Sequence, residues 1–87
     1  EGLVDEVPLS DDLSITQIRT PARMVGKTLV DLMLPRHSEV IVVAIRRSTG
    51  EGETRLIMPD PNEPIRDDDV LVIVSSPEAA HRLLEQK

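Results

Sequence analysis

Two short apolar runs, residues 40–45 and 70–74, constrain the fold of this chain more than any other feature. They read VIVVAI and VLVIV, and their β-branched side chains favour strands over helices. Neither run approaches the ~20 residues that a membrane-spanning helix requires. We therefore expect both to be strands, and the continuous run 40–45 to be buried on both faces of a sheet.

Two weaker patterns supply further strands. Residues 13–18 alternate apolar and polar, which predicts a half-buried strand with Leu13 and Ile15 on the same face. Residues 54–58 follow a Gly-containing turn and return alongside 40–45, which predicts a hairpin.

Two helices complete the predicted order. Residues 26–34 favour a short helix that is capped by Thr28 and stopped by Pro35. A second helix begins after Ser76, an N-cap residue, with Pro77 at the first helical position. The order β-α-β-β-β-α predicts an α+β lobe of about four strands and two helices.

Composition indicates one small domain with a need for partners. The 87 residues include no Phe, Tyr, Trp or Cys, so the core must consist of aliphatic side chains, and burial against a second copy would add stability.

Residues 1–12 carry five acidic groups and no basic one, and we expect a linker or tether, loosely ordered up to about Ser10, before a domain at 13–87. The net charge of −6 argues against nucleic acid as a partner.

The densest negative charge, Asp67, Asp68 and Asp69, directly precedes the run 70–74. A calcium loop of the EF-hand spacing is absent, and adjacent aspartates commonly build turns by bonding backbone N–H groups. We therefore interpret these residues as a structural turn with solvated carboxylates, and expect no metal and no cofactor.

His37 and His81 lie far apart in sequence without a neighbouring nucleophile, so we do not expect the chain to be an enzyme.

Four segments, in order, carry a resemblance to a known family. They are MVGKTLVDLMLP, VIVVAIRRSTG, the single Pro59, and IRDDDVLVIVSSPE. Over about 13–86 the chain resembles the TrkA-C domain, the C-terminal lobe of RCK modules, which regulate potassium conductance. One departure is that Asp68 stands where the family usually has Gly.

The resemblance implies a dimeric regulatory domain of a potassium channel, potassium transporter or other cation transport system. Such a domain is cytoplasmic, at the inner face of the cell membrane, and belongs to the transporter chain or to a separate subunit. It senses a ligand or mediates assembly through dimerisation. The alternative is a purely structural dimerisation or adaptor domain of an anion permease or antiporter, without a small-molecule ligand.

The resemblance also suggests where an effector would bind, in a groove between two copies. The groove residues that it implies are Leu34, Pro35, Arg36, His37, Val40, Ile41 and Pro59. In some family members this groove binds c-di-AMP, typically with Arg where this chain has Pro35 and Asn where it has Ile41. Both polar contacts are missing here, so c-di-AMP is disfavoured and another small effector is left open.

Overall fold

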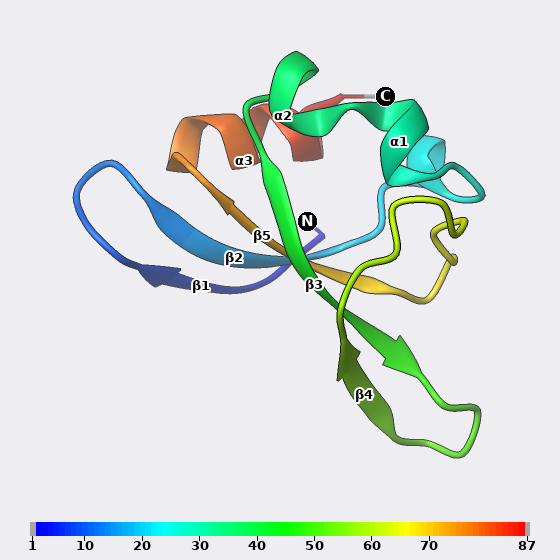
Figure 1. The fold of residues 1–87 in the computed structure, drawn as a ribbon. Coiled ribbons are helices and arrows are strands. Elements are labelled where there is room, and N and C mark those ends of the chain that lie inside the picture. Colours follow the sequence, from blue (N-terminus) through cyan, green and yellow to red (C-terminus); the bar gives the residue numbers. More distant parts are fainter. Residues whose placement is uncertain (1, 87) are drawn as a thin grey trace.

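The structure, a computed structural model, describes residues 2–86 and contains an antiparallel sheet with helices along one side (Figure 1). Glu1 and Lys87, the outer ends of the predicted linker and domain, lie outside the described residues. The elements in chain order are β1 (Leu3–Pro8), β2 (Ser14–Arg19), the 3-10 turn η1 (Ala22–Met24), α1 (Leu29–Leu32), α2 (Leu34–His37), β3 (Ile41–Ser48), β4 (Thr54–Ile57), β5 (Val70–Ser75) and α3 (Pro77–Glu85).

The last strand in sequence lies at the centre of the sheet. The strand order is β1-β2-β5-β3-β4, and every neighbouring pair is antiparallel. Because β5 has a neighbour on each side, its Leu71 and Ile73 are fully buried and its Val72 is 9% exposed. The α+β class is confirmed, and the described residues form five strands where about four were predicted.

The additional strand is β1. Leu3–Pro8, predicted to be a loosely ordered linker, pairs along β2, with Val7 opposite Ile15 and Glu6 opposite Thr16. The expectation of loose order was wrong, because the acidic composition concealed an extended segment at a sheet edge, where every residue of β1 stays exposed. That residues 1–12 link this domain to another stays a prediction.

The predicted helix 26–34 is divided in two. Thr28 caps α1 as expected, its Oγ1 accepting a hydrogen bond from the backbone N–H three residues later at 3.1 Å. The helix breaks at Met33, which adopts the left-handed conformation (φ 47°, ψ 49°). The predicted stop at Pro35 is wrong, because this proline lies in the first turn of α2, where its missing N–H leaves no partner unpaired. The helix that begins at Pro77 is confirmed.

The core lies between the sheet and the helices and contains no aromatic ring. Its buried members are Ile18, Met24, Leu34, Val40, Ile45, Ile65, Leu71, Ile73, Ala79, Ala80 and Leu83. Side chains from β2, β5 and β3 meet those of α3 there, on the side of the sheet that the helices cover. We call this side of the sheet the covered face.

Strand registers place two predicted strands differently from expectation. β3 is not buried on both faces, because Ile41 is 52% exposed and Val43 is 40% exposed, and only Ile45 of this strand is fully buried. In β2, the buried row on the covered face begins with Ser14 and Thr16 rather than with apolar residues. The cause is that the other face of the sheet carries no helix.

Candidate functional site

The acidic turn before β5 is organised by Asp69. Its buried carboxylate accepts two hydrogen bonds from Arg47, Oδ1 from Nε at 2.9 Å and Oδ2 from Nη2 at 2.8 Å. Oδ2 also accepts from the backbone N–H of Arg66 at 2.9 Å, and the carbonyl oxygen accepts from Thr20 Oγ1 at 2.8 Å. This bidentate pair links β3 to the start of β5. The interpretation as a structural turn is confirmed.

The electrostatics of this turn favour the ionised pair. Burial raises the pKa of Asp69, but the hydrogen bonds from Arg47 and from the Arg66 backbone outweigh it, and the pKa lies below its ordinary value. The hydrogen bonds to Asp69 raise the pKa of Arg47, which also forms an ion pair with Glu63. Solvation of all three aspartates was therefore a wrong expectation for Asp69, because Arg47 supplies the partner that makes its burial favourable.

The other two aspartates of this turn, Asp67 and Asp68, are exposed. Asp68 replaces the family's Gly without strain, since the non-glycine residues with positive φ in the described chain are Met33 and Glu39. Within residues 2–86, no three His, Asp or Glu side chains are grouped so that they could hold a metal ion. The hydrogen bonds of Asp69 to Arg47 make the turn a structural clamp between β3 and β5.

The structure separates the predicted groove residues. Leu34 and Val40 belong to the core, 4% and 0% exposed, and Pro59 is half-buried after β4. Pro35 and Ile41 are exposed and line one shallow groove of about 480 Å³. Leu34 and Val40 therefore pack inside the fold, whereas Pro35 and Ile41 face outward.

Arg36 and His37 line a different hollow. It has a volume of about 190 Å³ and lies between α2 and the end of α3, where Arg82 and Glu39 also line it. Arg82 is paired with Glu39, Nη2 donating to Oε1 at 3.1 Å. The two arginines make this hollow a weakly basic spot on an acidic chain, next to the apolar groove but not continuous with it in one copy.

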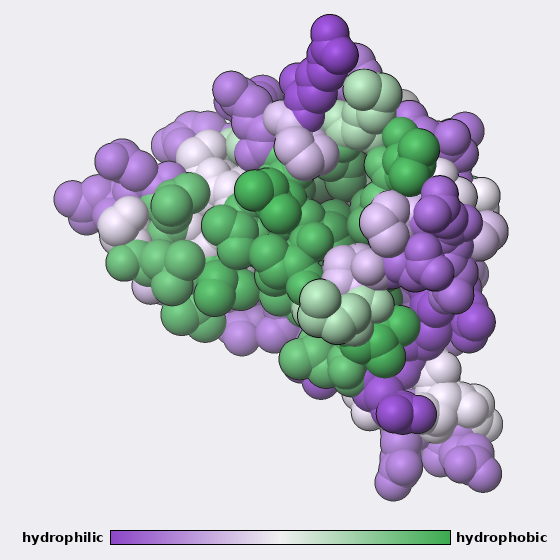
Figure 2. Space-filling model, in the orientation of Figure 1, coloured by the Kyte–Doolittle hydropathy of each residue, from purple (hydrophilic) through white to green (hydrophobic). Residues whose placement is uncertain are grey.

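The face of the sheet opposite the helices is apolar and exposed. One row of directly paired residues crosses four strands, from Val7 through Ile15 and Val74 to Ile41. Leu13 and Val43 lie near the row and are 44% and 40% exposed. We call these six residues the open face. Figure 2 shows a broad apolar area across the strands, bordered by polar side chains at the tip of the β3–β4 hairpin.

Sequence reasoning found Ile41 and missed most of the open face. Val7 lay in the predicted linker, Leu13 and Ile15 were expected to face the interior, and Val74 was expected to be buried. The usable signal was pairing: once β5 is placed between β2 and β3, the alternation of side chains along each strand puts these residues on the same side.

Comparisons with solved structures identify the fold. The C domain of the RCK (regulator of conductance of K+) protein KtrA, solved in complex with cyclic diadenosine monophosphate, matches with a TM-score of 0.74 and 23% identity over 88% of this chain and 86% of that one. The RCK domain of GsuK matches with a TM-score of 0.67 and 23% identity over 86% of this chain and 16% of that one. The fold is that of an RCK C domain.

The family follows from sequence. A family model, the TrkA-C domain, matches residues 13–87, and the chain belongs to this family. The Ktr system potassium uptake protein C of Bacillus subtilis (strain 168) is 30% identical over 75 residues, which cover 86% of this chain and 32% of the relative. The chain therefore spans about a third of that relative's length. The family is one of regulatory domains of transporters and not an enzyme family.

In the stretch from Gly2 to Gln86, none of the helices has the length and apolar character needed to cross a membrane.

Proposed function

We propose that this chain is a cytoplasmic regulatory domain of a potassium or other cation transport system and that it acts as a homodimer. The observation that carries the proposal is its membership of the TrkA-C family over nearly the whole chain, together with its likeness to a potassium uptake protein. The transporter is a separate membrane-embedded protein or another part of the same polypeptide.

The open face supplies the surface for dimerisation. A stable interface takes roughly 800 Å² from each partner, a modest share of the 5740 Å² surface of one copy. Two copies related by a two-fold axis would place Ile41 of one near Ile41 of the other, so that exposed apolar side chains on each copy cover those of its partner. A chain with an aliphatic core of this size gains stability from that burial.

The predicted effector groove then lies at the edge of the dimer interface. Pro35 and Ile41 supply an apolar surface, and Arg36 supplies positive charge from the neighbouring hollow. A small anion with an apolar part suits this combination. An adenine base needs hydrogen bonds that Pro35 and Ile41 do not provide, and an unpaired buried polar edge costs about 1–3 kcal/mol. c-di-AMP is therefore expected to bind weakly.

The proposed function is tested at the genomic locus that encodes the chain. Ile41→Asp introduces a charge into the open face, and Val30→Asp is the matched control, since Val30 is 53% exposed on α1, away from this face. Growth at limiting potassium and uptake of rubidium as a potassium tracer are measured. We expect Ile41→Asp to change uptake by at least about twofold, a modest regulatory coupling, and Val30→Asp to leave it unchanged.

Deletion of the segment 13–87 can give results that contradict the proposed function. If cation uptake is unchanged by the deletion, the chain does not regulate cation transport. If uptake of an anion changes instead, the chain is an adaptor domain of an anion permease.

A further inference from the structure

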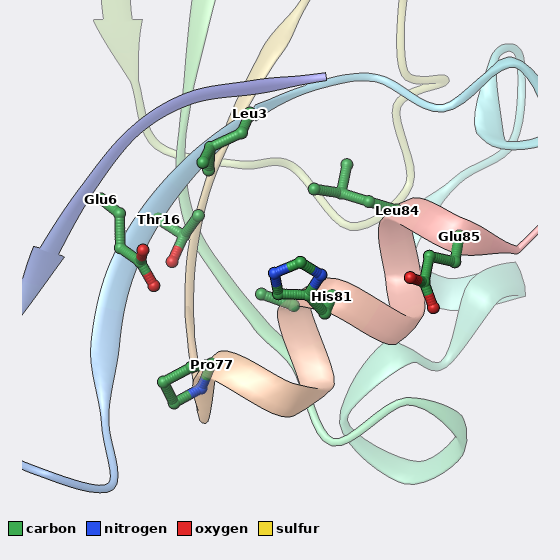
Figure 3. A pocket seen from close by; sticks show the side chains of 8 residues that line it. Leu3, Glu6, Thr16, Pro77, His81, Leu84 and Glu85 are labelled. Atoms are coloured by element: carbon green, nitrogen blue, oxygen red, sulfur yellow. The ribbon is translucent and has the colours of Figure 1, made fainter. Parts of the chain in front are cut away.

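A third cavity lies on the covered face, between the edge strand β1 and the helix α3. Its volume is about 250 Å³, and Leu3, Pro77, Ala80 and Leu84 give it apolar walls. Figure 3 shows β1 and β2 on one side of it and α3 on the other. The cavity is separate from the predicted effector groove, because Thr16, which lines it, and Ile15, which belongs to the open face, point to opposite faces of β2.

This cavity depends on a strand that the family match does not include. β1 lies before residue 13, where the match begins. The chain at the start of β1 lies close against α3, since a Cβ on Gly2 would lie 3.1 Å from Leu84 Cδ2. The backbone N–H of Arg19 donates to the carbonyl oxygen of Gly2 at 2.8 Å, which fixes this end of the strand. The cavity is thus formed in part by residues that lie outside the family match.

A buried polar group faces the cavity. Thr16 is 1% exposed, and its Oγ1 has no hydrogen-bond partner among the described residues. Its side chain lines the cavity, and Figure 3 shows it directed between Glu6 and the helix. A buried hydroxyl without a partner is unfavourable, so a ligand that bonds to it would regain free energy that the fold alone does not supply.

The charge around the cavity is negative. Glu6 on β1 and Glu85 on α3 line it together with His81, and none of its lining residues is Lys or Arg. Figure 3 shows the two carboxylates toward opposite ends, with the imidazole ring between them. Both glutamates are exposed, so they attract a cation without holding a desolvated charge. Apolar walls, a free hydroxyl and two carboxylates suit a molecule with an apolar body and a positively charged amine.

We propose that the cavity between β1 and α3 binds a small organic amine, with its apolar body against Leu3, Ala80 and Leu84, its ammonium group at Glu6 and a hydrogen bond to Thr16 Oγ1. The size fits, since an apolar cavity of about 150 Å³ accommodates benzene, and the present cavity is larger. An anion is disfavoured at the nearby start of α3, because Pro77 has no N–H and Ser76 Oγ already accepts from the Ala79 N–H at 3.1 Å.

The test is a titration of the nitrogen-15-labelled chain, followed by NMR in buffer with EDTA so that metal ions play no part. The probe is 2-phenylethylamine, and 2-phenylethanol is its neutral match. We expect saturable amide shifts at Thr16, Ala80 and Leu84 with a dissociation constant on the order of 1 mM, as suits a ligand this small. The alcohol should bind at least about fivefold more weakly, which is the expected contribution of one ammonium–carboxylate contact.

Three variants locate the binding. Glu6→Gln should weaken the amine at least about threefold, whereas Glu78→Gln, the same charge change on α3 outside the cavity, should leave it unchanged. Thr16→Val removes the hydroxyl while keeping the shape, and should weaken binding without unfolding the domain, because that hydroxyl has no partner to lose.

Three results would overturn the proposal. They are equal affinity for amine and alcohol, shifts centred on the open face instead of the cavity, and the absence of saturation at about 20 mM amine, far above the expected dissociation constant. None of these results bears on dimerisation or cation transport, so failure here leaves the proposed function standing.

Discussion

The two faces of the sheet are built from similar side chains but differ in what covers them. On the covered face, Ile18, Leu71 and Ile73 are fully buried beneath α3. At the start of β5 this face also contains the ion pair of Asp69 with Arg47. On the open face, Ile15 and Val74 of the same strands are only half-buried, and Ile41 of β3 is 52% exposed. The hydrophobic character of a side chain therefore does not show whether it is buried within a single copy. An apolar face that no helix or strand covers indicates a missing partner.

Removal of the Asp69 carboxylate should have the largest effect on the covered face. Asp69→Asn leaves the buried Arg47 without its bidentate partner, and breaking a buried pair in this way costs about 3–5 kcal/mol. Urea denaturation followed by circular dichroism measures the change. Asp68→Asn, one residue earlier and exposed, should alter stability by less than about 0.5 kcal/mol. Equal effects of the two variants would show that the clamp is not what holds β3 to β5.

A matched pair on β3 compares the two faces directly. Ile45 is 4% exposed on the covered face and Ile41 is 52% exposed on the open face. Ile45→Ala should cost about 2–4 kcal/mol at every protein concentration, because its contacts lie within one copy. Ile41→Ala should cost under about 1 kcal/mol in dilute solution and more as concentration rises, because its contacts form between copies. A concentration-independent loss for Ile41→Ala would contradict the distinction.

The pH dependence of stability should carry a smaller signature of the same clamp. Because the folded pKa of Asp69 lies below its ordinary value of 3.8, its contribution is fully present above that value and is lost as pH falls through the folded pKa. Free energies of unfolding, measured from pH 7 down to about pH 2.5, should decline below about pH 4 in the wild type. The decline should be shallower in Asp69→Asn. Parallel curves would mean that Asp69 titrates alike in the folded and unfolded chain.

The sequence was informative where one short segment determines the structure. Thr28 and Ser76 capped their helices as expected, and the runs around Ile45 and Leu71 were strands. The errors arose where a neighbour decides. The exposure of Ile41, the burial of Thr16 and the pairing of Asp69 depend on which strand or side chain lies alongside, which alternation within one strand does not reveal.

The candidate site was less predictable than the fold for the same reason. The resemblance singled out Pro35 and Ile41, which the structure brings to one groove, and also Leu34 and Val40, which it buries. The cavity beside Thr16 had no signal in the sequence, because it is formed by β1 and α3, which are far apart along the chain.

Sedimentation equilibrium tests most directly whether the open face is an interface between copies. At tens of micromolar protein, we expect the wild type and Val30→Asp to have twice the 9.7 kDa mass of one chain, and Ile41→Asp to have the mass of one chain while remaining folded. A wild type that stays at the mass of one chain, or an Ile41→Asp variant that dimerises as well as the wild type, would contradict the assignment of the open face.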